Sequence, residues 1–387
     1  MKVLYCALAI DITRSHGGAT HVAEVANGLG ALGHDLWVIA AGGHDAYASQ
    51  IDGRVSLVQT PPALAWQMIP RVRRIVRAWR PDVVMERFYT FAGGGIIAAH
   101  AHGIPSLLEV NAPIFDPPGS RKERIDRLTG RMMRRWATQQ CRWADRIVTP
   151  LATTVPEEVR AKVVPLPWGA NVSRFDPARM PASSSAVAAL RARYGIAGGA
   201  PVIGFVGSFR PWHGAHDALR AYHIVRQSLP EARLLFVGDG PERRDLEEAA
   251  GDDRGVIFAG AVPYADVPAH IALCDVMVAP FAPSQHAPLR HFGFYWSPLK
   301  VFEAMAMAVP IVTTAIMPLT EIVDDAGVCV PEGDNEAMAR AIVEIIVGRQ
   351  VHDAMGANGR ARVIEHYSWQ AHCRHLDRIL SEMVARP

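Results

Sequence analysis

The sequence is poor in cysteine and has no closely spaced cysteine pair. Five cysteines are scattered over 387 residues: Cys6, Cys141, Cys274, Cys329 and Cys373. An odd number without close spacing argues against a disulfide framework and against a structural zinc site. Such cysteine usage favours a reducing compartment, so we expect the protein to be cytoplasmic.

The sequence also lacks a hydrophobic run that could span a bilayer. Its first apolar stretch ends at Asp11 without a cleavage-site pattern, which favours a buried strand over a signal peptide. The formal net charge is only +2, so overall charge gives no argument for nucleic-acid binding. We therefore expect a soluble protein without a nucleic-acid partner, and we leave open a peripheral contact with the inner face of the membrane.

Several catalytic patterns are absent as well. The first glycine-containing loop, residues 13–18, has no GxGxxG, so a dinucleotide-binding site is poorly supported. No Ser/His/Asp or Cys/His set suggests a side-chain nucleophile. Two histidine pairs are better explained as surface residues than as metal ligands: His100 with His102, and His372 with His375. We expect neither a metal nor another cofactor.

What the sequence does contain is a regular alternation of strand and helix patterns. An apolar strand, a glycine-containing polar loop and an amphipathic helix follow one another over residues 2–32, and the same order returns over residues 201–225. Such alternation predicts mostly parallel sheets, with ligands beyond the carboxyl ends of the strands. The predicted fold class is α/β, with two Rossmann-like domains facing each other across a cleft.

The length of the chain suits two domains. Residues 165–181 are rich in proline and turn residues and have no sustained periodicity, which predicts a linker. We therefore place the first domain at residues 1–180 and the second at residues 181–366. A terminal helical region follows at residues 367–387.

The run from Phe292 to Val312 contains the clearest candidate site. Ser297 and Pro298 predict a helix start, with the serine as a cap and the proline in the first turn. The free N–H groups and the positive dipole end of such a helix suit a diphosphate. Further along, Glu303 could accept hydrogen bonds from two ribose hydroxyls. The alternative is an ordinary helix in which Lys300 and Glu303 form an (i, i+3) ion pair.

Two segments are unusually basic. Residues 71–80 contain five arginines around Trp79, and residues 121–135 contain seven basic residues interleaved with methionines. A basic amphipathic helix can lie on an anionic membrane or meet an anionic acceptor. A solvated helix face is the simpler explanation.

The motifs along the whole chain, taken in order, resemble those of glycosyltransferase family 4. Its members are retaining enzymes of the GT-B fold that use nucleotide-diphosphate sugars. The resemblance is carried by GGATHVAEVANGLGALGHDLWVI, PWGANVSRF, GFVGSFRPWHG, LLFVGDGPE, FAGAVPYADV, SPLKVFEAMAMAVPIV and a terminal SW helix. It implies an acceptor-side first domain, a nucleotide-sugar-binding second domain, and a C-terminal helix that crosses back onto the first domain.

The resemblance also implies a donor site in which Glu303 binds the ribose and the N-terminal glycine pair approaches the donor. The expected donor-binding residues are Gly17, Gly18, Ser208, Arg210, His213, Gly238, Val262, Arg290, Phe294, Tyr295, Trp296, Ser297, Pro298, Leu299, Lys300 and Glu303.

The chain departs from the family pattern in the diphosphate clamp. The usual arginine and lysine of the second-domain glycine loop fall at Ser208 and His213. Arg210 is expected to supply the charge instead, because a guanidinium can bind two phosphate oxygens at once. A histidine is charged only part of the time near neutral pH. Lys300 or Arg290 could compensate.

A second departure concerns the donor sugar. The first member of the family's glutamate pair falls at Tyr295, so sugar contacts are expected from the backbone N–H groups of residues 294–296. In the first domain, a histidine common among relatives aligns near Asn111, and Glu109 is expected either to position the acceptor hydroxyl or to be a buried structural acid. The expected catalytic residues are Glu109, Asn111 and Arg210.

The resulting hypothesis is retaining transfer of a sugar, with a UDP-sugar favoured as donor, to an acceptor hydroxyl that the sequence does not identify. In this class the leaving diphosphate helps to deprotonate the incoming hydroxyl, and catalysis rests on positioning and charge stabilisation. Two alternatives stay open: a GT-B epimerase or phosphorylase, and a catalytically degenerate subunit that binds a nucleotide sugar.

Overall fold

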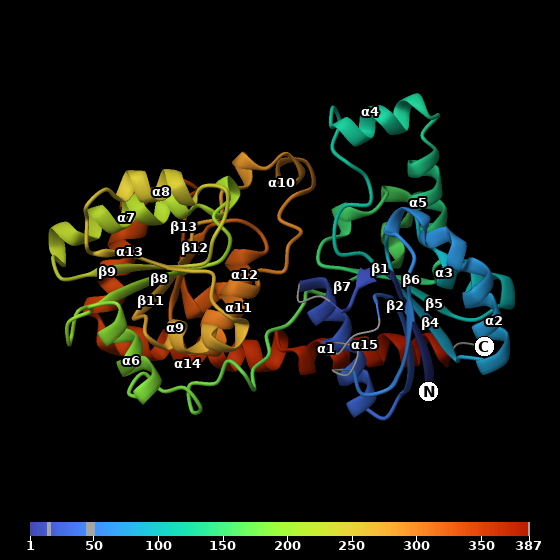
Figure 1. Cartoon of the computed structure of the whole chain (residues 1–387), viewed down its shortest axis with the longest axis horizontal. Helices are drawn as coiled ribbons and strands as arrows, with labels where there is room; N and C mark the ends of the chain where they lie inside the picture. Colours follow the sequence, from blue (N-terminus) through green and yellow to red (C-terminus); the bar gives the residue numbers. More distant parts are fainter. Residues whose placement is uncertain (14–16, 44–50, 386–387) are drawn as a thin grey trace. The chain divides into compact units, whose positions relative to one another are not determined.

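The computed structural model describes residues 1–13, 17–43 and 51–385, and the chain forms two compact units (Figure 1). Unit 1 comprises Met1–Trp168, His291–Ser297 and Trp369–Pro387, and unit 2 comprises Gly169–Arg290 and Pro298–Ser368. The chain therefore leaves unit 1 after Trp168 rather than at the expected residue 180. Residues 291–297, expected in the second domain, belong to unit 1.

Aromatic packing accounts for the end of unit 1 at Trp168. Its ring lies 4.5 Å from the ring of His21 and 6.3 Å from that of Trp369, measured between centroids. Because both partners belong to unit 1, the tryptophan fixes the chain there before the proline-rich segment begins.

In the described part of unit 1, parallel strands form one sheet in the order β3-β2-β1-β4-β5-β6-β7. The strands are β1 (Lys2–Asp11), β2 (Asp35–Ala41), β3 (Arg54–Val58), β4 (Val83–Arg87), β5 (Ser106–Glu109), β6 (Arg146–Thr149) and β7 (Val163–Pro165). The helices are α1 (Gly17–Ala31), η2 (Pro62–Met68), α2 (Ile69–Trp79), α3 (Gly94–His102), α4 (Arg121–Leu128), α5 (Met132–Trp143), η3 (Ala152–Thr154), η4 (Glu157–Lys162) and α15 (Trp369–Val384).

Strand β1 is apolar on both faces because helices cover both sides of the sheet. Val3 and Tyr5 pack in one buried cluster with residues of α1 and α15, whereas Leu4 and Cys6 pack in another with residues of α2 and α3. Helix α15 approaches α1 closely: a Cβ on Gly28 would lie 2.3 Å from the sulfur of Cys373.

In unit 2 the described strands are also parallel, in the order β10-β9-β8-β11-β12-β13. The strands are β8 (Val202–Val206), β9 (Arg233–Val237), β10 (Val256–Gly260), β11 (Val276–Ala279), β12 (Ile311–Thr314) and β13 (Gly327–Val330). The helices are α6 (Ser185–Arg193), η5 (Pro211–His213), α7 (Ala215–Ser228), α8 (Arg243–Ala250), η6 (Tyr264–Asp266), α9 (Val267–Ala272), η7 (Pro283–Gln285), α10 (Ala287–Phe292), α11 (Leu299–Ala306), α12 (Leu319–Val323), η8 (Asp324–Ala326), α13 (Asn335–Val347) and α14 (Arg349–His366). The last two residues of α10 belong to unit 1.

The predicted parallel α/β architecture is confirmed in both units. In each sheet the strand order reverses at a central pair, β1 and β4 in unit 1 and β8 and β11 in unit 2. Such a reversal point opens a crevice at the carboxyl ends of the strands, where α/β proteins bind ligands. The topology therefore locates one candidate site in each unit.

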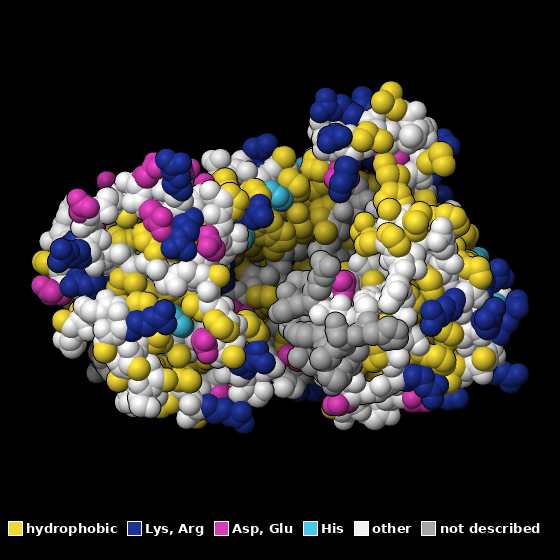
Figure 2. All heavy atoms as spheres, viewed as in Figure 1, with side chains coloured by type: hydrophobic (Ala, Val, Ile, Leu, Met, Phe, Trp, Pro, Cys, Tyr) yellow, Lys and Arg dark blue, Asp and Glu magenta, His cyan; other side chains and the backbone are white. Residues whose placement is uncertain are grey.

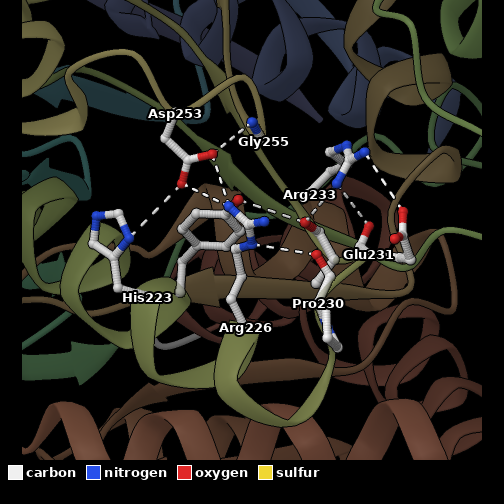
Figure 3. Close-up of polar contacts among 9 residues, drawn as sticks. His223, Arg226, Pro230, Glu231, Arg233, Asp253 and Gly255 are labelled. Atoms are coloured by element: carbon white, nitrogen blue, oxygen red, sulfur yellow. Dashed lines mark hydrogen bonds and ion pairs between the residues drawn. The ribbon is translucent and has the colours of Figure 1, made fainter.

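The opposite, amino-terminal edge of the unit 2 sheet is held by a polar network (Figure 3). Arg226 of α7 donates to both carboxylate oxygens of Asp253, at 2.8 and 3.0 Å, and to the carbonyl of Pro230 at 3.3 Å. The N–H of Gly255 donates to the same aspartate at 2.8 Å. These contacts tie α7 to the loops that precede β9 and β10, far along the strands from the reversal point.

Candidate functional site

The candidate site of unit 2 begins with two loops that lie against each other at the carboxyl ends of β8 and β9. Gly207 follows β8 with a φ of +139°, and Gly238 follows β9 with a φ of +142°. A Cβ on Gly238 would lie 2.0 Å from the carbonyl oxygen of Gly207. Glycine is therefore required at position 238 by both backbone conformation and space.

Lys300 lies directly beside this loop, on the first turn of α11. Its Nζ would be 2.8 Å from a Cβ on Gly207, 4.4 Å from the ring centroid of Phe205 and 5.2 Å from that of Phe281. Because Phe205 belongs to β8 and Phe281 follows β11, the ammonium lies at the carboxyl ends of the two central strands.

The Lys300 ammonium is buried and has no hydrogen-bond partner within the described residues. Burial lowers the pKa of this lysine to about 7, while the nearby Glu303 raises it in part. The ion pair with Glu303, which was the alternative interpretation of this helix, is not formed: no such pair occurs within 4.0 Å in the part of the chain described. An unpaired buried cation at the carboxyl ends of the central strands indicates an anionic ligand.

Glu303 lies one turn further along α11 and is 6% exposed. The hydroxyl of Tyr264 donates to its Oε1 at 2.8 Å, and the guanidinium of Arg174 lies 4.8 Å from the centre of the tyrosine ring. Burial raises the pKa of Glu303 to about 7, with Tyr264, Lys300 and Arg174 opposing that rise. The carboxyl group retains acceptor capacity for a bound hydroxyl.

The glycine loop after β8 carries the other expected clamp residues. His213 has its Nδ1 2.7 Å from the carbonyl oxygen of Ser208, which can only accept, so the proton lies on Nδ1. Burial and the nearby Lys300 lower the pKa of His213 to about 4. The histidine is therefore neutral at pH 7 and brings no positive charge. Arg210 is exposed, with its guanidinium 5.4 Å from the ring centre of Trp212.

The remaining expected residues of unit 2 lie around the same edge with less specific contacts. Val262 follows β10 and is partly buried, as is Leu299, whereas Pro298 is buried. Arg290 is exposed and donates to the carbonyl oxygen of Ser284 at 2.6 Å, so its guanidinium is already engaged.

The aromatic residues 294–296, which precede α11, belong to unit 1. They were expected to form one donor site together with Lys300 and Glu303. Phe294 and Tyr295 are buried, and the Tyr295 N–H donates to the carbonyl of Gly293 at 3.0 Å rather than standing free for a sugar. The prediction that Ser297 caps α11 is wrong, because α11 has no side-chain cap. The Ser297 hydroxyl oxygen instead accepts a hydrogen bond from the backbone N–H of Trp168 at 2.9 Å.

The N-terminal glycines open α1, whose first residue is Gly17. Among the described residues, a Cβ on Gly17 would meet only the ring of Trp168, at an ordinary 3.8 Å, so these residues impose no steric demand for glycine there. Gly18 follows in the same helix. Part of the preceding loop, residues 14–16, lies outside the described residues.

Glu109 and Asn111 are part of a buried network at the carboxyl end of β5. Tyr5 donates to the Glu109 carboxylate at 2.7 Å, Arg87 donates at 3.2 Å, and the Asn111 amide donates as well. The Nε2 of His21 lies 2.5 Å from the same carboxylate. Burial alone would raise the pKa of Glu109, but His21, Arg87 and Asn111 hold it well below its usual range.

Sequence reasoning missed most partners in these networks. His21, Tyr5 and Arg174 carry no local motif, because each becomes significant only through a contact distant in sequence. His372, expected at the surface, is 5% exposed, and its Nδ1 lies 2.8 Å from the carbonyl of Pro167. Among the described residues, no three His, Cys, Asp or Glu side chains are grouped so that they could hold a metal ion.

Two family models match the chain, one in each half. A model described as glycosyltransferase family 4 matches residues 15–165, and a model described as glycosyl transferases group 1 matches residues 200–347. The unit 2 match includes the loop at 207–214 and α11 with Lys300 and Glu303.

Named relatives differ in their donors and acceptors. The chain is 29% identical, over 221 residues, to a GDP-mannose-dependent alpha-(1-6)-phosphatidylinositol monomannoside mannosyltransferase of Mycolicibacterium smegmatis. That match covers 56% of the chain and 55% of the relative. The chain is also 28% identical, over 357 residues, to a 2-deoxystreptamine N-acetyl-D-glucosaminyltransferase of Streptomyces fradiae. This second match covers 82% of the chain and 77% of the relative.

A solved structure, Anabaena HepE in complex with UDP, superposes on the chain with a TM-score of 0.71 at 19% identity. The superposition covers 99% of this chain and 100% of that one. Together with the two parallel sheets, this likeness confirms the predicted GT-B fold class.

Proposed function

Because the chain belongs to glycosyltransferase family 4, we propose that it is a retaining glycosyltransferase that uses a nucleoside-diphosphate sugar. The observation that carries the proposal is Lys300, a buried ammonium without a hydrogen-bond partner in the described chain, at the reversal point of unit 2. Burying an isolated charge is unfavourable, and a diphosphate in the crevice would compensate it.

In the proposed reaction, the bond between the anomeric carbon and the diphosphate oxygen breaks. A bond from the acceptor oxygen to the same carbon forms on the same face of the sugar. The acceptor proton passes to the leaving diphosphate, so no side-chain nucleophile and no metal are needed. Lys300 and Arg210 would stabilise the charge that develops on the diphosphate, which is where such a site gains most of its rate.

Glu303 is proposed to bind the ribose. Its carboxylate already accepts one hydrogen bond from Tyr264 and has lone pairs left for two vicinal hydroxyls. Its position one turn beyond Lys300 on α11 matches the order of the donor, with diphosphate at the helix start and ribose further along. Arg174, over the Tyr264 ring, would keep the tyrosine in place.

In unit 1 we propose a positioning role for Glu109. The carboxylate is buried and surrounded by Tyr5, His21, Arg87 and Asn111, so it is ionised and occupied. A group with so many partners is poorly suited to exchange a proton with the acceptor. It would act by fixing Arg87 and Asn111 at the reversal point of the unit 1 sheet.

We propose UDP as the nucleotide. The likeness of the whole chain to the UDP complex of HepE supports this choice, and the GDP-mannose dependence of the Mycolicibacterium relative makes GDP the necessary comparison. We also propose that the protein needs no metal and works in the cytoplasm.

The proposal is tested with purified protein and a panel of UDP-, GDP- and ADP-sugars. Stabilisation against heat identifies the nucleotide, and nucleotide release with and without candidate acceptors identifies the reaction. Acceptor-dependent release supports transfer. An isomerised donor would indicate an epimerase, and tight donor binding without turnover on any acceptor would indicate a catalytically inactive subunit. Unchanged donor affinity in Glu303→Ala would refute the ribose assignment.

A further inference from the structure

Helices α4 and α5 form a hairpin in unit 1, and α5 packs against the core through Ala137, Gln140 and Cys141. In Figure 1, α4 lies away from the sheet, with α5 leading back toward it. Helix α4 buries none of its residues. The hairpin exposes apolar side chains where the two helices meet: Leu128 is 88% exposed, Met132 67% and Ile125 45%. We call these three residues the apolar tip.

Basic side chains surround the apolar tip. Residues 121–135 contain seven basic and two acidic side chains, a net charge of +5. Figure 2 shows dark blue and yellow side chains side by side over this part of the molecule. Arg121, Arg124, Arg131 and Arg135 make no ion pair with any residue that the structure describes, so their charge is free to meet a partner.

The two acidic side chains are already occupied within the hairpin. Asp126 accepts from the N–H groups of Met133 and Arg134 at 2.8 and 3.2 Å. Glu123 is paired with Arg127 at 2.6 Å. They shape the turn rather than offset the basic surface.

A second basic segment, α2, provides the contrast. Its Val72, Ile75 and Val76 are buried in the core of unit 1, so only its charged face is exposed. That helix is fully explained as a solvated face. The preceding turn η2 also exposes large apolar side chains, with Trp66 51% and Leu64 39% exposed.

We propose that the α4–α5 hairpin docks on an anionic lipid surface. The apolar tip would enter the acyl region while the free arginines bind lipid phosphates, an arrangement that combines apolar burial with charge attraction. Neither a nucleic acid nor an acidic protein surface accounts for the exposed leucine and methionine among these basic side chains. The inference does not depend on donor binding or on transfer.

The test is sedimentation of the full-length protein with vesicles, in the absence of nucleotide. One set contains phosphatidylcholine alone, and the other contains about one third phosphatidylglycerol. We expect binding only to the anionic set, and a decrease in binding as salt is raised. In Leu128→Ser/Met132→Ser, and separately in Arg121→Glu/Arg124→Glu, affinity should fall by about tenfold or more.

Two matched variants remove exposed apolar side chains elsewhere. Trp66→Ser in unit 1 and Val347→Ser in unit 2, where the valine is 68% exposed, should bind vesicles like the wild type. Circular dichroism checks that each variant is folded. Absence of wild-type binding to anionic vesicles at low salt would overturn the proposal. Full binding by the tip variant, or loss in Trp66→Ser instead, would overturn it equally.

Discussion

Replacing Lys300 by methionine should affect stability and donor binding in opposite directions. Methionine has similar length and no charge, so it can fill the space beside Gly207 and over the Phe205 ring without an unpaired ammonium. If Lys300 binds a diphosphate, replacing it should stabilise the ligand-free protein and lower the affinity of the protein for the donor. A purely structural lysine would show the opposite effect on stability.

The size of the expected stability change follows from the pKa of Lys300. A fall from the ordinary 10.5 to about 7 corresponds to about 5 kcal/mol of unfavourable burial. The contacts of the ammonium with the rings of Phe205 and Phe281 recover about 1–2 kcal/mol. The net gain for Lys300→Met is therefore about 3 kcal/mol in the free energy of unfolding. Loss of a charged hydrogen bond to the diphosphate should weaken donor binding about 10- to 100-fold.

The stability difference between Lys300→Met and the wild type should also depend on pH. The folded pKa lies below the unfolded one, so the unfolded state binds more protons between pH 7 and 10.5. The cost of burying Lys300 is therefore complete at pH 7 and below and disappears as the pH rises toward 10.5. The advantage of Lys300→Met should shrink over the same range.

Urea unfolding at pH 6.5 and 9.5, followed by circular dichroism, measures the stability change, and titration with UDP measures binding. Lys122→Met is the matched control, because Lys122 is 78% exposed and should change neither quantity. The reasoning fails if Lys300→Met is less stable than wild type at both pH values while its UDP affinity is unchanged.

Three further outcomes are expected. UDP affinity, measured by calorimetry, should be highest near pH 7, because Lys300 loses its proton above that pH and Glu303 gains one below it. Glu109→Gln should lower the free energy of unfolding by about 3 kcal/mol, since Arg87 would stay buried without its charged partner. Asp253→Asn should lower it by about 1–2 kcal/mol and leave UDP affinity unchanged, because the network of Figure 3 lies at the opposite edge of the sheet.

Each of these outcomes has a control. The loss of affinity above pH 7 should be absent in Lys300→Met. Glu158→Gln removes a carboxylate from a surface pair with Arg142, in which both side chains are at least half exposed, and should cost well below about 1 kcal/mol. A change in UDP affinity in Asp253→Asn would contradict the separation of the structural network from the site.

The fold was accessible from the sequence because each strand repeats the same physical pattern. Strands such as β1 and β8 are short apolar runs followed by glycine-containing loops, which is the pattern that parallel sheets with two covered faces require. Local signals were weaker at the unit boundary. Trp168 lies within a proline-rich stretch that predicts a linker, yet its ring contacts hold it to unit 1.

Only part of the candidate site could be predicted from the sequence. The position of Lys300 and Glu303 on one helix could be read from their spacing, but the absence of an ion pair between them could not. The Ser297 cap failed because the serine hydroxyl has a tertiary partner, Trp168, that competes with the local signature. The contact of Tyr5 with Glu109 joins two strands of one sheet that are far apart in the sequence, so no local sequence pattern predicts it.

The two units treat their buried charges differently, and this contrast separates a scaffold from a binding site. In unit 1, Glu109 is matched by Arg87 and several hydrogen-bond donors, so its charge is satisfied without a ligand. In unit 2, burial moves the pKa values of Lys300 and Glu303 toward 7 from opposite sides, because the protein supplies too few partners. Because the protein leaves both groups with few partners, the proposed nucleoside diphosphate would supply negative charge to Lys300 and hydroxyl donors to Glu303.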